Sequence, residues 1–432
     1  MADGRLGRHH RRQSDGDRRR LPRPQPLGPR QGGKQDRLPE GRSDRQPDGG
    51  GAEGLYRHHE RGGDEPDHPH HLRRGGSRRA ARGARAPEVT ISPSRASLQF
   101  AALVVGSLAV LVLAVATAVG IGEMHIPLRT VALAVTNQFG WTSADISRIQ
   151  ASVIWDLRLS RALVAALCGA GLAMCGAILQ SLLRNALAEP YVLGISAGAS
   201  TGAVAVIILG VGAGAVTLSM GAFAGALSAF LFVAVLSGGG RGGADRTILS
   251  GVAAAQLFNA LTAYIVTTSG NAQQARDVMF WLLGSLGGVR WPEFQLLAVV
   301  VAIGLGVCIW YARALDAFTF GDDAAASMGI PVERVRLVLF AITAVMTATI
   351  VSMVGSIGFV GLVVPHAVRF LIGPGHIRLL PACLLVGAVF MVLADIVSRS
   401  VMQQQTLPIG IVTALVGVPC FALILYRARP AT

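Results

Sequence analysis

Long apolar stretches separated by short polar links make up the chain from Leu98 onward. A helix crosses the ~30 Å hydrocarbon layer of a membrane with roughly 20 apolar residues, so each stretch of that length predicts a membrane-spanning helix. The sequence therefore predicts an all-α integral membrane protein of about ten spans, the third and eighth short enough to be broken helices. The predicted spans are 98–120, 161–181, 192–212, 215–236, 247–268, 293–312, 335–354, 357–372, 377–397 and 408–426.

The arginines near the span ends indicate how the chain is oriented. With the amino terminus inside, ten arginines of the membrane part lie near inner span ends and seven near outer ends. Because cytoplasmic loops carry an excess of Lys and Arg, we expect a multi-pass protein of the cell membrane with both termini cytoplasmic. The outer arginines, among them Arg158, Arg161 and Arg399, run against this rule and need an explanation of their own.

Glycines recur at helical spacing inside two spans. Gly194, Gly198 and Gly202 occur at every fourth residue, and Gly221 and Gly225 repeat that spacing. Small residues on one face let two helices approach closely in a membrane, where lipid supplies no hydrophobic force between them. We expect close helix packing here, and the alternative is that this face lines a transport path.

A second group of glycines falls between the seventh and eighth spans. Gly355, Gly358 and Gly361 are followed by Pro365, and together they predict a kinked or broken passage through the membrane. His366, next to Pro365, is either a hydrogen-bonded packing residue or a group that lines the path.

Composition divides the chain near residue 95. Residues 1–95 carry 22 Lys and Arg, 13 Asp and Glu and 7 of the 10 histidines, with almost no aliphatic runs. Such a segment cannot bury enough apolar surface to order itself, which predicts a disordered, basic, low-complexity tail before a membrane domain at 96–428. The tail could bind polyanions or metal, but its irregular Gly, Pro and Arg mixture favours a spacer, or upstream sequence translated from a GC-rich reading frame. We expect no nucleic-acid partner.

The distribution of charge bears on the energy source. The one lysine, Lys34, lies in the tail, and no Ser or Thr follows it as a nucleotide-binding P-loop requires. The spans hold few of the Asp, Glu or His residues that ion-driven carriers place near the midplane. Asp395 precedes Arg399 by four residues, which predicts an ion pair at the outer end of the ninth span. A partner that binds ATP is therefore expected, and a stand-alone secondary carrier is the alternative.

The five cysteines all fall in apolar stretches without metal-ligand spacing. We interpret them as small residues facing lipid or core, and expect no metal site, no cofactor and no catalytic residue.

The longest inner link, 314–334, has the pattern of a docking element. It predicts two short helical pieces broken at 329–331, with Asp322 and Asp323 suited to a helix N-terminus and Pro331 to the first position of the next helix. A compact, alanine-rich helical pair suits a groove on another protein, and a solvated loop is the alternative.

Several separated motifs resemble one known family, the membrane subunits of type II ABC importers, which are permeases for ferric siderophores, haem and cobalamin. Ser160 and Ala186 stand where that family commonly has proline, which affects local loop geometry. The motifs are WDLRLSRAL at 155–163, GAGLA at 169–173, LLRNALAEP at 182–190, LGISAGA at 193–199, FWLLGSL at 280–286, GFVGLVVPH at 358–366 and LPIGIVTA at 407–414.

The resemblance implies the type II permease fold with ten spans, a second identical or sister permease subunit, a path between the two, and a dimer of separate ATPase subunits. It implies an extracytoplasmic substrate-binding protein whose glutamates pair with Arg158, Arg161 and Arg399. It also implies that the chain is no enzyme and that its cargo is a ferric siderophore, with haem or cobalamin as alternatives. Candidates for the translocation path are Gly194, Ser196, Gly198, Pro365 and His366. The residues implied to couple to the ATPase are Gly321, Asp322, Asp323, Ala325, Met328, Gly329 and Ile330.

Overall fold

The computed structural model describes residues 95–427, apart from 123, 125, 240–241, 269–270 and 403–404. The prediction for the basic tail lies outside the described residues. Within the described ranges the chain forms helices joined by turns, with no strand. The elements are α1 (Arg95–Gly120), α2 (Leu128–Gln138), α3 (Arg148–Ser152), η1 (Val153–Leu159), α4 (Ser160–Leu182), η2 (Pro190–Leu193), α5 (Ile195–Leu209), α6 (Leu218–Leu236), α7 (Gly243–Thr268), α8 (Ala272–Leu282), α9 (Trp291–Trp310), α10 (Ala312–Phe318), α11 (Asp322–Ser327), α12 (Val332–Val354), α13 (Val360–Ile372), α14 (His376–Ser400) and α15 (Ile409–Arg427).

Ten of these helices coincide with the ten predicted spans. Seven are long and apolar enough to cross a membrane, and the continuous helix formed by α3, η1 and α4 is one of them. The apolar helices α5, α13 and α15 take the places of the third, eighth and tenth spans, and α5 and α13 have only 15 and 13 residues. The prediction that the third and eighth are short is therefore confirmed. The hydrophobic pattern did not predict α2 and α8, two short amphipathic helices between spans.

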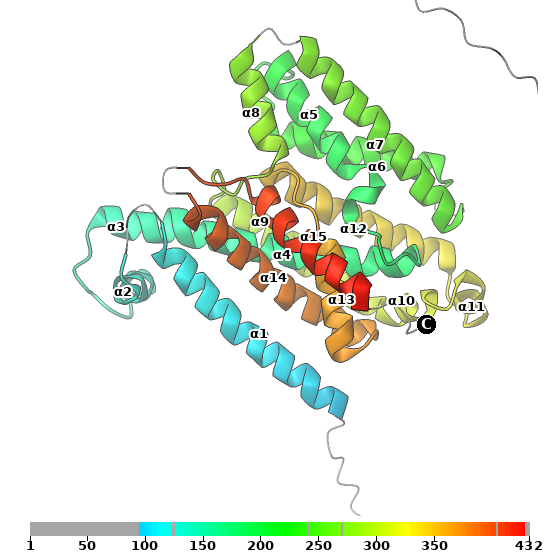
Figure 1. Ribbon diagram of the computed structural model, residues 1–432, viewed down its shortest axis with the longest axis horizontal. Coiled ribbons are helices and arrows are strands. Elements are labelled where there is room, and N and C mark those ends of the chain that lie inside the picture. The colour runs from blue at the N-terminus through cyan, green and yellow to red at the C-terminus, as the bar shows by residue number, and fades with distance from the viewer. Residues whose placement is uncertain are drawn as a thin grey trace, which may run out of the picture. The chain divides into compact units, whose positions relative to one another are not determined.

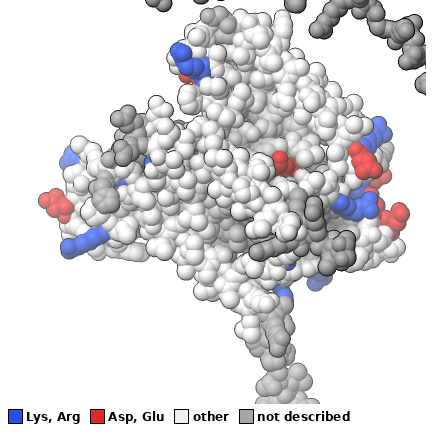
Figure 2. All heavy atoms as spheres, viewed as in Figure 1, with Lys and Arg blue, Asp and Glu red and all other residues white. Residues whose placement is uncertain are grey.

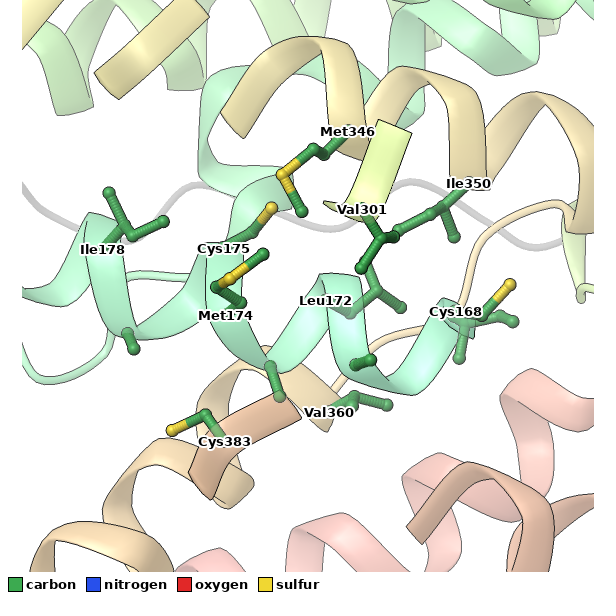
Figure 3. Packing of buried hydrophobic residues seen from close by; sticks show 14 of the residues in the cluster. Cys168, Leu172, Met174, Cys175, Ile178, Val301, Met346, Ile350, Val360 and Cys383 are labelled. Atoms are coloured by element: carbon green, nitrogen blue, oxygen red, sulfur yellow. The ribbon is translucent and has the colours of Figure 1, made fainter. Parts of the chain in front are cut away.

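Helix α4 lies at the centre of the bundle (Figure 1). It packs against α9, α12, α13 and α14, and its residues from Cys168 to Leu182 are all buried. A helix that is apolar on every side can lie in lipid or inside a protein, and the Ala and Gly residues of α4 let neighbouring helices approach it closely. Figure 3 shows Leu172, Cys175 and Met346 in this core. Four of the five cysteines are buried and all five are free thiols, as expected of small packing residues.

The glycine repeat packs α5 against α6, as the spacing predicts. A Cβ atom at Gly198 would lie 2.3 Å from the Gly225 carbonyl oxygen, and one at Gly202 would lie 2.0 Å from that of Gly221. These distances are far below van der Waals contact, so only glycine allows this approach. Gly194 differs from the other two, because it precedes α5 in a left-handed conformation (φ 69°) and faces Ala254 of α7.

The outer surface of the bundle is suited to lipid. Large apolar side chains such as Val105, Leu231 and Val235 are more than 60% exposed. Figure 2 shows charged side chains gathered mainly at the two ends of the bundle and at the upper left, where Figure 1 has α8, with a broad, almost uncharged surface between them. Soluble proteins rarely expose an apolar surface of this extent to water, whereas a protein that spans a bilayer needs such a surface against the lipid chains.

Candidate functional site

The predicted break between the seventh and eighth spans is present. Helix α12 ends at Val354 and α13 begins at Val360, and the residues between them are not helical. The Tyr191 hydroxyl of η2 donates to the Ile357 carbonyl and accepts from the Ile357 amide, both at 2.7 Å. Backbone groups inside a membrane must be satisfied by protein or must line a wet cavity, and Tyr191 supplies both bonds for Ile357.

Two other non-helical segments, the one that follows α8 and the one that precedes α15, are hydrogen-bonded at or next to this break. The Ser285 amide donates to the Val354 carbonyl at 2.8 Å, and the amides of Ile409 and Gly410 donate to the carbonyls of Gly284 and Leu283, both at 3.1 Å. We call residues 190–194, 283–286, 355–359 and 407–410 the central junction. Four segments far apart in the sequence are thus joined by hydrogen bonds of their backbone amides and carbonyls, groups that would bond to each other within a continuous helix.

A cavity of about 710 Å³ adjoins the central junction. Aromatic and apolar groups line part of it, including Phe280 and Trp281 of the FWLLGSL motif. Its polar lining residues are Arg161, Asp277, Ser285, Ser398, Gln405 and Thr406. A space of mixed polarity beside interrupted helices is the arrangement that transporters use at substrate sites.

The predicted path residues divide between packing and this junction. Gly194 and Gly198 are packed against other helices, and Pro365 is buried inside α13. Ser196 is half-buried and its hydroxyl donates to that of Ser356 in the break at 3.0 Å. His366 is half-buried, with Nδ1 2.8 Å from the Leu362 carbonyl and its ring against Phe421 of α15. None of these five residues lines the cavity of about 710 Å³.

The three predicted docking arginines lie together at one end of the bundle, around Asp395. Asp395 is fully buried, with Oδ1 2.8 Å from Arg161 and Oδ2 3.0 Å from Arg399. The predicted i,i+4 pair is therefore confirmed, but it lies within protein and includes a second arginine. Three arginines against one carboxylate leave two positive charges in excess within this cluster.

Two of these arginines also hold the end of α1. Arg158 donates to the carbonyls of Val119, Gly120 and Met124, and Arg399 donates to those of Ala118 and Ile121. The C-terminal carbonyls of a helix carry its negative dipole end, so guanidinium groups stabilise it. Arg158 is consequently buried and Arg399 is half-buried, with 8% of its side chain exposed. Of the three arginines, Arg161 is the one that lines the cavity.

The segment predicted to dock to an ATPase forms α10 and α11 at the opposite end of the bundle. Gly321 precedes α11 as its N-cap residue with φ 108°, and Asp322 and Asp323 occupy the first turn of the helix as predicted. The break falls at 328–331 as expected, but the second piece, from Ile330, is the turn before the long α12 rather than a separate short helix. The sequence also missed α10 as an independent element.

Some side chains of the α10–α11 segment bind it to the rest of the bundle, and others are exposed. Asp322 pairs with buried Arg336 of α12 at 2.5 Å, and Ala325 is buried. Phe320 is 79% exposed and Met328 is 58% exposed, and Asp323 and Gly329 are exposed too. The segment is thus fixed to the spans on one side and presents apolar side chains on the other.

Several residues at the central junction and around the cavity have no signal in the sequence pattern. Tyr191 and Ser356 of the junction, and Gln405 and Thr406 of the cavity lining, are polar residues near span ends, and such residues are ordinary in any loop. They lie near one another only because the non-helical segments come together in the folded protein.

Comparisons with known proteins agree with this architecture. Residues 109–427 match the FecCD transport family. The cobalamin import system permease protein of Halobacterium salinarum is 39% identical over 305 residues, covering 70% of this chain and 80% of that protein. The iron(3+)-hydroxamate import system permease protein of Bacillus subtilis is 34% identical over 330 residues, covering 76% and 83%.

A solved inward-facing structure of a metal-chelate type ABC transporter has the same fold. It superposes with a TM-score of 0.66 at 28% identity, covering 75% of this chain and 99% of that chain. The family match extends from within α1 to the end of α15, so it includes the central junction and both ends of the bundle. The chain therefore belongs to the FecCD transport family, as its motifs predicted.

Proposed function

We propose that this chain is the membrane permease subunit of an ATP-driven importer of a metal chelate. The observation that carries the proposal is the family match over the whole membrane part, together with a lysine-free bundle whose α10–α11 segment exposes apolar side chains. A separate ATPase dimer docks on that segment and supplies the energy. A second permease subunit, identical or related, completes the path, and both chain termini lie on the cytoplasmic side.

Transport proceeds by alternating access. ATP binding in the partner subunits moves α10 and α11, which changes the relative stability of outward and inward states of the bundle. The cargo enters near the cavity at the central junction and leaves when the inward state binds it poorly. The permease itself makes and breaks no covalent bond.

The substrate-binding protein docks at the end of the bundle that carries the arginine cluster. The excess positive charge there favours acidic side chains on the partner, which steer association more than they add affinity. Arg161 is the first contact, because it already reaches the cavity. Arg158 and Arg399 join only if they exchange carbonyl oxygens of α1 for carboxylates, so docking and the position of α1 are coupled.

The cargo we propose is a ferric siderophore. The iron(3+)-hydroxamate permease of Bacillus subtilis supports an iron chelate, and the metal-chelate type transporter supports a metal chelate in general. Cobalamin is the second candidate, because the permease from Halobacterium salinarum, with 39% identity, is named for its import.

Competition uptake separates these cargoes. Cells that express the chain with its ATPase and binding protein are given radiolabelled ferric hydroxamate, and unlabelled cobalamin or haem is added in excess. We expect iron uptake that neither competitor reduces. Uptake of labelled cobalamin instead, with no iron entry, would reject the siderophore and leave the metal-chelate proposal in place.

A further inference from the structure

A chain of three hydrogen-bonded side chains joins α10 to α14 and α4. Oδ1 of Asp316 accepts from the His376 backbone amide at 2.9 Å and lies 2.6 Å from His376 Nδ1. On the other side of the ring, Nε2 lies 2.6 Å from the Ser181 hydroxyl. His376 is 1% exposed and Ser181 is 4% exposed, so both lie inside the protein.

These residue types are the ones found in serine hydrolases, but the surroundings do not suit that chemistry. A nucleophilic serine must reach a substrate. Ser181 is buried within α4, and its oxygen lies 3.1 Å from the carbonyl of Ala177 one turn earlier. The cavity at the central junction is lined by none of the three residues. The arrangement therefore fixes helices relative to one another.

Both ring nitrogens of His376 are occupied, which fixes the imidazole between two elements. Asp316 accepts the proton of Nδ1 and caps the N-terminus of α14, where the helix dipole stabilises a carboxylate. Nε2 either accepts from the Ser181 hydroxyl, or donates to it while that hydroxyl bonds to Ala177. In each case the ring connects α10 with α4. Arg369 of α13 is the other charged group that acts on His376.

The location of this chain of bonds gives it a mechanical consequence. Helix α10 packs against α4 and α14, whereas α11 packs against α10 and α12. The α10–α11 segment is therefore held by two acids, Asp316 and Asp322, each bonded to a basic residue at the start of a span. A displaced α10 must move α14 and the central helix α4 with it, or break a charge-assisted bond.

We propose that Asp316, His376 and Ser181 form the link that passes movement of α10 to α14 and α4, with His376 as the positioning residue. The link rests on the proposed function, in which the ATPase moves the α10–α11 segment. It acts on α4, the central helix of the bundle, and on α14, which packs against α4.

The test measures solute imported per ATP hydrolysed by the full complex in proteoliposomes. Losing one charge-assisted hydrogen bond changes an equilibrium constant about tenfold. We therefore expect Asp316→Ala to lower the ratio of solute imported to ATP hydrolysed about tenfold, while the rate of ATP hydrolysis stays within about twofold of the wild type. Asp316→Asn keeps an oxygen that accepts both N–H groups and restores most of the ratio. His376→Asn can still donate to Asp316 but cannot reach Ser181, so it lowers the ratio as Ser181→Ala does.

Asp245→Ala is the matched control, because Asp245 is an exposed acid in the first turn of α7 and lies outside the link. It keeps the wild-type ratio. Ser181→Ala removes only one hydroxyl group. If the Asp316→Ala protein does not insert into the membrane, the ratio is measured with Ser181→Ala instead. An unchanged ratio in Ser181→Ala and His376→Asn, or an equal fall in hydrolysis and uptake, would overturn the link. A wild-type complex that imports no solute would instead refute the proposed function.

Discussion

Replacing Gly202 by alanine tests the close contact between α5 and α6. The added Cβ would lie 2.0 Å from the Gly221 carbonyl oxygen, so the helices must separate by about 1.4 Å to restore the 3.4 Å of ordinary contact. Overpacking of this kind costs about 1–3 kcal/mol, against which alanine gains about 0.5–1 kcal/mol over glycine inside a helix. A contact of 2.0 Å with a backbone atom lies at the upper end of that cost, so we expect a net loss of about 2 kcal/mol.

The assay is thermal unfolding of the purified permease in detergent, followed by circular dichroism. A loss of this size corresponds to a fall in Tm of about 2–5 °C. Gly306→Ala is the control, because Gly306 lies inside α9 with no atom within 4 Å of an added Cβ. Its Tm should stay level or rise slightly. A Gly202→Ala protein as stable as the wild type, or an equal fall for both variants, would refute the packing argument.

Three further predictions follow from the site. Asp395→Asn leaves Arg161 and Arg399 without a buried counter-charge, so we expect about 3–5 kcal/mol lower stability in the same unfolding assay; an unchanged Tm would contradict this. Met328→Glu places a charge on the exposed face of the α10–α11 segment and should reduce ATPase binding, measured by co-purification, without reducing membrane insertion. Tyr191→Phe removes the hydroxyl that satisfies both backbone groups of Ile357, so uptake should fall about tenfold with normal expression, whereas wild-type uptake would show that the junction tolerates the loss.

The fold was largely predictable because hydrophobic length is a direct consequence of membrane thickness. All ten predicted spans coincide with helices, and the glycine repeat at Gly198 and Gly202 identified a helix contact that the structure contains. The break after Val354 was also predictable, because glycines and a proline disfavour a continuous helix there.

The sites were less predictable because their geometry depends on tertiary contacts. Sequence spacing paired Arg399 with Asp395, but it could not show that Arg161 shares the same carboxylate or that Arg158 bonds to the end of α1. Asp316, His376 and Ser181 belong to three distant segments, and no local pattern relates them. The role of the arginines in docking and the role of 321–330 in ATPase coupling therefore stay predictions.

The central claim is that these spans form a conduit whose energy comes from a separate ATPase. Its most direct test is metal-chelate uptake into proteoliposomes that contain the purified permease, first alone and then with its ATPase, binding protein and ATP. We expect accumulation against a gradient only when all companions and ATP are present, and it should persist when the proton gradient is collapsed. Accumulation by the permease alone, driven by an ion gradient, would contradict the account.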